Sequence, residues 1–271
     1  MTQRFGIIDD PFMTLIERIQ LRKSCFIAAV AVIVAAYAVK LPMERALNRD
    51  YAALGFGNVS SLLSVREKLS QYMFVALMGG FRNVVANLLW ISAHNDWERH
   101  LWFKQKEKYH VVNTLQPNSI YFWDNAAWHF AWNSSYAASV DPLEPRESVR
   151  ARNQQMWFDL GEETLKKGIE HNPGSWELHA AMARLLADKQ KRPLEAAEYY
   201  RKAAAFPETP TYLKRQVAFK LLDGGDIQGA YDEMRRLWLD SEDNHVPTFR
   251  TRIPELEDQL QIPSEKRLFA R

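Results

Sequence analysis

Apolar and small residues recur three and four positions apart along much of the chain, which is the spacing of an amphipathic α-helix. The pattern is clearest over residues 174–207. It predicts one helix over 175–186, a break at 189–192 and a second helix that opens on Pro193, because proline suits a first helical position that needs no N–H. Small and aromatic residues share one face of the second helix: Ala196, Ala197, Tyr200 and Ala203. The stretch therefore predicts a helical hairpin.

This hairpin pattern repeats with a period of 34 residues, the separation of Pro173 and Pro207. The residues that recur 34 positions apart are Ala196 and Ala230, Tyr200 and Met234, and Ala203 and Leu237. A helix–turn–helix period of this length, with small and aromatic residues at these positions, resembles the tetratricopeptide repeat (TPR). The resemblance implies an α-solenoid in which the first helix of each unit lines a concave side that binds extended peptides or partner helices.

The other apolar segments fit the same architecture. We expect helices over about 79–99, 101–115, 119–138 and 142–171, and a last unit over 208–241. Thr209 as N-cap, followed by Pro210, would start this last unit. No stretch of useful length alternates as a β-strand does, so the predicted fold is all-α. It comprises a repeat domain over 79–241 and a C-terminal capping segment over 242–271, in which residues 254–262 cover the open end of the stack.

One unit is longer than the period. Pro117 and Pro173 are 56 residues apart, which is 34 plus 22. Asp141 and Glu144 resemble a capping box, so we expect the second helix of this unit to open at about 142 and to reach 171. Gly161 is a candidate kink. The sequence thus predicts one overlong helical hairpin that projects from the array.

The N-terminal part predicts a membrane anchor. A tail over 1–23 precedes an uncharged run over 24–41, which basic residues flank and which reads as a single transmembrane helix. Two alternatives stay open: a signal peptide cleaved after Ala36-Tyr37-Ala38, and a buried core helix. Basic residues slightly favour an N-terminus in the cytoplasm, which would place the large domain on the far side of the membrane.

A second apolar run, over 72–91, is not expected to cross the membrane. Arg82 lies in its middle and costs about 2.5–3.5 kcal/mol at the centre of a membrane helix. The run is also two-sided, with Asn83 and Asn87 opposite the apolar positions. We therefore assign it to an amphipathic helix of the repeat domain, which follows a connector over 42–78.

Composition and motifs argue against several function classes. The formal net charge of +2 gives no reason to expect nucleic acid as a partner. The chain has one cysteine, Cys25, and no phosphate-binding loop, zinc-ligand spacing or nucleophile elbow. His94 and His100 are six residues apart and would point to different sides of a helix. We therefore expect neither an enzyme nor a cofactor or metal site.

Candidate binding residues instead lie on the predicted first helices of two units. The first carries Asn83, Asn87, Trp90 and His94, and the second carries Asn125, Trp128 and Trp132. Asparagine amides can bind a peptide backbone, and tryptophan is a frequent interface anchor. The alternative is that these tryptophans pack the neighbouring hairpin. The Lys, Arg and Asn set of TPR proteins that bind a C-terminal carboxylate cannot be located, so we do not expect that ligand.

Several short motifs also resemble a group of bacterial membrane-anchored TPR proteins. They are Gly79-Gly80-Phe81-Arg82, Leu88-Leu89-Trp90, Leu115-Gln116-Pro117, Ala131-Trp132-Asn133 and Asn172-Pro173. The resemblance implies a bacterial membrane protein. Together with the uncharged run and the charge bias, it leads us to expect a single-pass protein of the inner membrane whose repeat domain lies in the periplasm. Two hypotheses follow. The protein is an adaptor that holds another envelope protein or assembles a complex, or it is a structural subunit buried in a larger membrane assembly of the transport or secretion type.

Overall fold

The structure is a computed structural model and describes residues 80–269, all of which belong to the second of two compact units of the chain, Val65–Arg271. The first helices are α4 (Arg82–Glu98), α5 (Trp102–Leu115) and α6 (Ile120–Trp128), followed by the π-helix η1 (His129–Ser134), α7 (Ser135–Ser139) and α8 (Glu147–His171). Next come α9 (Trp176–Asp188), α10 (Pro193–Ala204), α11 (Thr211–Asp223), α12 (Ile227–Asp240) and α13 (Pro247–Gln259). Short 3₁₀ turns lie at Glu242–Asn244 and Ser264–Lys266. Within residues 80–269 there is no strand, which confirms the all-α prediction.

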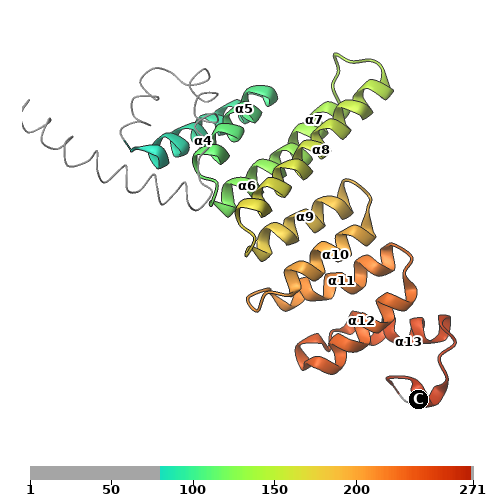
Figure 1. Ribbon diagram of the computed structural model, residues 1–271. Coiled ribbons are helices and arrows are strands. Elements are labelled where there is room, and N and C mark those ends of the chain that lie inside the picture. Colours follow the sequence, from blue (N-terminus) through green and yellow to red (C-terminus); the bar gives the residue numbers. More distant parts are fainter. Residues whose placement is uncertain (1–79, 270–271) are drawn as a thin grey trace, which may run out of the picture. The chain divides into compact units, whose positions relative to one another are not determined.

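Neighbouring helices pack against one another in chain order, in the manner of helical repeats (Figure 1). The closest pairings are α4 with α5, α9 with α10, α10 with α11, and α11 with α12. Contacts also form between helices that are not consecutive in the chain, because α6 touches both α8 and α9. The first helix of one pair thus meets the first helix of the next pair.

The α9–α10 hairpin matches the sequence prediction closely. The Ser175 hydroxyl caps α9 by accepting a hydrogen bond from the Leu178 amide at 3.2 Å, and Pro193 opens α10. The predicted face of α10 is buried, and so are its counterparts in α12: Ala196, Ala197, Tyr200, Ala203, Ala230, Met234 and Leu237. The 34-residue pattern therefore marks positions that share the same buried environment.

Two predicted helix boundaries are wrong. Thr209 does not cap α11, which begins at Thr211 with Pro210 as its N-cap. The Thr209 hydroxyl instead donates to the Ala203 carbonyl and so closes the end of α10. The C-terminal element is also not limited to residues 254–262, since α13 begins at Pro247 and contains Pro254. Proline within a helix forfeits one backbone hydrogen bond, and the carbonyl left without it belongs to Arg250, an exposed residue that water can reach.

The long hairpin has helices that exceed their neighbours, since α8 has 25 residues against 13 in α9 and 12 in α10. However, α8 begins at Glu147 and not at 142. Asp141 and Glu144 form no capping box, because their carboxylates accept hydrogen bonds from the amides of Leu143 and Arg146 at 2.9 and 3.1 Å. These bonds shape the turn that precedes the helix.

Glycines in α8 allow it to approach its neighbours closely. A Cβ on Gly161 would lie 3.0 Å from the Leu185 Cδ1 atom and 3.1 Å from the Ala131 Cβ atom. A Cβ on Gly168 would lie 2.9 Å from the Trp123 side chain. Gly161 thus sits inside one uninterrupted helix, where its lack of a side chain serves close packing against α9 and η1.

The predicted N-terminal elements fall outside the described residues. They are the tail over 1–23, the membrane anchor over 24–41 and the connector over 42–78. Of the helices in residues 80–269, none is long and apolar enough to cross a membrane.

Candidate protein-binding surface

The predicted binding residues of α4 take two different environments. Asn83, Asn87 and His94 are exposed, whereas Trp90 is half-buried. Helix α4 packs against α5 through a different face, on which Val85, Ala86, Leu89 and Ala93 are buried. The polar side chains therefore lie on a face that remains open in the described residues.

Trp90 and Asn125 are brought together, but they bind each other. The Trp90 Nε1 atom donates to the Asn125 Oδ1 atom at 3.4 Å, and the Tyr109 hydroxyl donates to the same oxygen at 3.4 Å. The Trp90 ring also packs 5.7 Å from the Tyr121 ring. For this pair the packing alternative describes the contacts, and the Asn125 carbonyl oxygen is already engaged within the protein.

A chain of aromatic rings connects α4 with the end of α6. His94 stacks on Trp97 at 5.1 Å, Trp97 lies 5.7 Å from His129, and Trp128 meets the same His129 at 5.1 Å. His94 and Trp128 are the exposed ends of this chain. Together with Trp90 and its neighbour Tyr121, these rings form what we call the aromatic surface: Trp90, His94, Trp97, Tyr121 and Trp128.

The outer rings of the aromatic surface are well exposed. Tyr121 is 56% exposed and Trp128 is 40% exposed. Large aromatic side chains on rigid helices offer much contact area at little conformational cost, which is why they dominate the energetics of protein interfaces. The exposed amide of Asn87 lies on the same helix as His94 and adds a donor and an acceptor.

His129 supports this surface from beneath. Its ring is buried, and its Nδ1 atom lies 2.9 Å from the Asn133 Nδ2 atom. Burial, with a smaller contribution from the nearby His94 charge, lowers the pKa of His129 to about 4. The imidazole is therefore neutral at pH 7, which allows Nδ1 to accept the Asn133 amide hydrogen. This residue acts as a packing element within an aromatic cluster.

Trp132 does not join the aromatic surface, although the sequence placed it with Trp128. The π-helix η1 spans His129–Ser134, and its wider turn alters the α-helical register on which the prediction relied. The Trp132 ring packs on the core formed by α6, α8, α9 and α10, and the Lys189 Nζ atom lies 4.9 Å from its centre. Trp128 and Trp132 thus lie in different environments.

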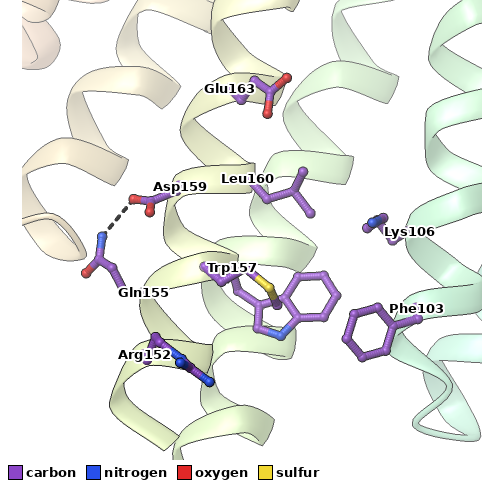
Figure 2. A pocket seen from close by; sticks show the side chains of 9 residues that line it. Phe103, Lys106, Arg152, Gln155, Trp157, Asp159, Leu160 and Glu163 are labelled. Carbon is purple, nitrogen blue, oxygen red and sulfur yellow. Dashed lines mark hydrogen bonds between the residues drawn. The ribbon is translucent and has the colours of Figure 1, made fainter. Parts of the chain in front are cut away.

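A cavity of about 430 Å³ opens between α5 and α8 (Figure 2). Phe103, Trp157 and Leu160 give it an apolar wall, and the Phe103 and Trp157 rings are 5.3 Å apart. Charged side chains from both helices surround this wall: Lys106, Arg152, Asp159 and Glu163. The Gln155 Nε2 atom donates to the Asp159 Oδ1 atom at 2.8 Å, which holds one carboxylate at the rim.

Sequence reasoning missed this cavity and also missed Trp97 and Tyr121. A signal existed for the cavity in α8, where Arg152, Met156, Asp159 and Glu163 recur at helical spacing. That spacing alone is equally typical of a solvated helix face. These residues line a cavity because α5 and α8 are separated from each other at this point.

In residues 80–269, no group of three or more His, Cys, Asp and Glu side chains is placed to hold a metal ion. No protein-family model matches the sequence, and no curated protein matches it either. The geometry of the aromatic surface is therefore the main guide to function.

Proposed function

We propose that this protein is a membrane-anchored adaptor of the TPR type that binds another protein of the bacterial envelope. The observation that carries the proposal is the aromatic surface, in which Tyr121 and Trp128 remain exposed on helices that are otherwise well packed. A helix or an extended peptide is the partner that suits it, because exposed rings can insert between side chains of such a segment while Asn83 and Asn87 bind its backbone.

The membrane part of the proposal rests on the sequence. The uncharged run over 24–41 would anchor the chain in the inner membrane, and the charge bias would place the repeat domain in the periplasm. An anchor raises the local concentration of the adaptor near membrane partners, so that even a modest affinity for each partner is effective.

The decisive experiment removes rings from the aromatic surface and compares them with a matched ring elsewhere. Tyr121→Ala and Trp128→Ala are introduced into the full-length protein, with Tyr212→Ala on α11 as the control, since Tyr212 is also 56% exposed. The protein is solubilised in mild detergent and the co-purifying chains are identified. We expect a specific partner to be lost at least tenfold from the first two variants and retained by the control.

The structural-subunit hypothesis is the second candidate, and the tip of the long hairpin favours it. Three large side chains are exposed there, Tyr136, Val140 and Leu143. Exposing apolar side chains to water does not stabilise the protein, so a group of them indicates a surface that another protein covers. A subunit would lose its assembly when Leu143→Asp and Val140→Asp are combined, whereas Tyr121→Ala and Trp128→Ala would leave it intact. Blue native electrophoresis of detergent extracts separates the two hypotheses.

A further inference from the structure

The cavity between α5 and α8 has a well-packed aromatic wall (Figure 2). The Trp157 side chain in this wall is only 3% exposed, and Phe130, which does not line the cavity, packs against its ring with 5.9 Å between the ring centres. Phe103 faces the same ring from α5. Pockets that bind small molecules commonly have volumes of about 300–1,000 Å³, apolar walls and a few well-placed polar groups. This cavity, at about 430 Å³, has such a size and such a wall.

The indole nitrogen of Trp157 has a hydrogen to donate but no acceptor. No group in residues 80–269 accepts a hydrogen bond from its Nε1 atom. By contrast, the Nε1 atoms of Trp90 and Trp123 donate to the Asn125 Oδ1 atom and the Pro117 carbonyl. The N–H group of a buried tryptophan normally finds such a partner. Because Trp157 lines the cavity, its N–H group is available to a molecule that enters there.

The two carboxylates at the rim of the cavity are already engaged. Asp159 accepts hydrogen bonds from the side-chain amides of Gln155 and Gln190 at 2.8 and 3.0 Å. Glu163 accepts one from the Lys167 Nζ atom at 2.6 Å, which is the main cause that lowers the pKa of Glu163. Both acids therefore have donors within the protein and do not require a cationic ligand.

The two cations at the cavity are less well satisfied. Arg152 is exposed, and no carboxylate in residues 80–269 pairs with it. The Lys106 Nζ atom lies 3.7 Å from the Glu107 Oε1 atom, which is longer than a hydrogen bond. An anion would therefore find partners here. A carboxylate suits the guanidinium group, whereas a phosphate dianion would be repelled more strongly by Asp159 and Glu163.

We propose that this cavity binds a small molecule that has an apolar body and one carboxylate. The body would lie against Phe103, Trp157 and Leu160, and Arg152 would bind the carboxylate, with the Trp157 N–H group as a second donor. Hydrogen bonds between a guanidinium group and a carboxylate are among the strong ones in proteins. A small molecule fits better than a protein segment, because the unpaired N–H group belongs to a nearly buried side chain that is reached only by entering the cavity.

This inference goes beyond the proposed adaptor function and does not depend on it. The cavity is formed by α5 and α8, whereas the side chains of the aromatic surface lie on α4 and α6. A ligand in the cavity and a protein on the aromatic surface can therefore be measured separately.

Ligand titration of the full-length protein in mild detergent tests the proposal, with phenylbutyrate as the probe and ligand-observed NMR as the readout. We expect Arg152→Gln to raise the Kd for phenylbutyrate at least tenfold, because it removes a charge-assisted contact. Arg250→Gln on α13 is the matched control, since Arg250 is also exposed, and it should leave the Kd unchanged.

Two related probes separate the parts of the ligand. Phenylbutyramide keeps the ring but has no charge, so it should bind the unmodified protein at least tenfold more weakly and respond little to Arg152→Gln. Butyrate keeps the carboxylate but lacks the ring, and it should also bind at least tenfold more weakly. Butyrate binding as tight as that of phenylbutyrate would overturn the proposal, because the site would then recognise only the anion.

The same measurements contain the other contradicting results. Equal Kd values for phenylbutyrate in the unmodified protein and in Arg152→Gln, as partition into detergent would give, would overturn the proposal. Absence of phenylbutyrate binding would also overturn it, and loss of a co-purifying chain from Arg152→Gln would then identify an acidic protein segment as the occupant. Tyr121→Ala and Trp128→Ala should leave the Kd for phenylbutyrate unchanged, so failure of this proposal is distinguishable from failure of the adaptor function.

Discussion

The two ends of the described array are built differently. At the C-terminal end, α13 buries Phe249, Ile253 and Leu256 against α12. Its exposed positions, apart from Pro247, are polar or charged: Thr248, Arg250, Thr251, Arg252, Glu255, Asp258 and Gln259. At the other end, α4 presents four exposed apolar side chains, Phe81, Val84, Leu88 and Ile91. A repeat array needs a polar outer face at each end to stay soluble, and only α13 provides one.

The difference shows how a repeat array ends. Helix α13 is a true terminus because its sequence alternates buried apolar and exposed polar positions around the helix. Helix α4 has the composition of an interior helix, with apolar residues on opposite sides.

The largest expected effect concerns the closed end. Phe249 lies on the inner face of α13 and is fully buried, so Phe249→Ala should lower the free energy of unfolding by about 3–5 kcal/mol. Phe103→Ala, at a ring that is 63% exposed, makes the same chemical change and should cost no more than about 1 kcal/mol. Denaturant unfolding of the detergent-solubilised protein measures both. A loss below about 1 kcal/mol for Phe249→Ala would mean that α13 does not seal this end.

A second prediction concerns how the stability of the protein depends on pH. His129 has a folded-state pKa of about 4, below its ordinary value of 6.5, so the unfolded chain binds more protons between these pH values. The stability that the neutral, buried His129 contributes is therefore fully present above pH 6.5 and is lost as the pH drops toward 4, by about 3 kcal/mol. His129→Gln should remove this part of the pH dependence. An unchanged slope in the variant would show that His129 is not responsible.

Much of the fold could be predicted from local signals. The α9–α10 hairpin was correct because its apolar spacing, its Ser175 cap and its opening Pro193 all act within one turn of the residues concerned. The start of α8 was wrong because Asp141 and Glu144 match a capping box in spacing, whereas Pro145 directly after Glu144 disfavours a helical backbone there.

The candidate site was less predictable because it depends on contacts between helices. The spacing of Trp90 and His94 correctly put them on one helix, but only the packing of α4 on α6 shows that Trp90 bonds to Asn125. The π-helix that separates the roles of Trp128 and Trp132 leaves no clear mark in the sequence. Tyr121 was missed because an aromatic residue near a helix start reads equally well as core.

The comparison of the two ends is tested most directly by one polar substitution made at both. Leu88→Asn on α4 and Leu256→Asn on α13 make the same change at side chains that are 53 and 3% exposed. Both variants lose helix propensity, but only Leu256→Asn places an amide in a buried apolar environment. In thermal unfolding of the full-length protein, we expect Leu256→Asn to be more destabilising by about 2–4 kcal/mol. Equal losses at the two positions would contradict the difference between the two ends.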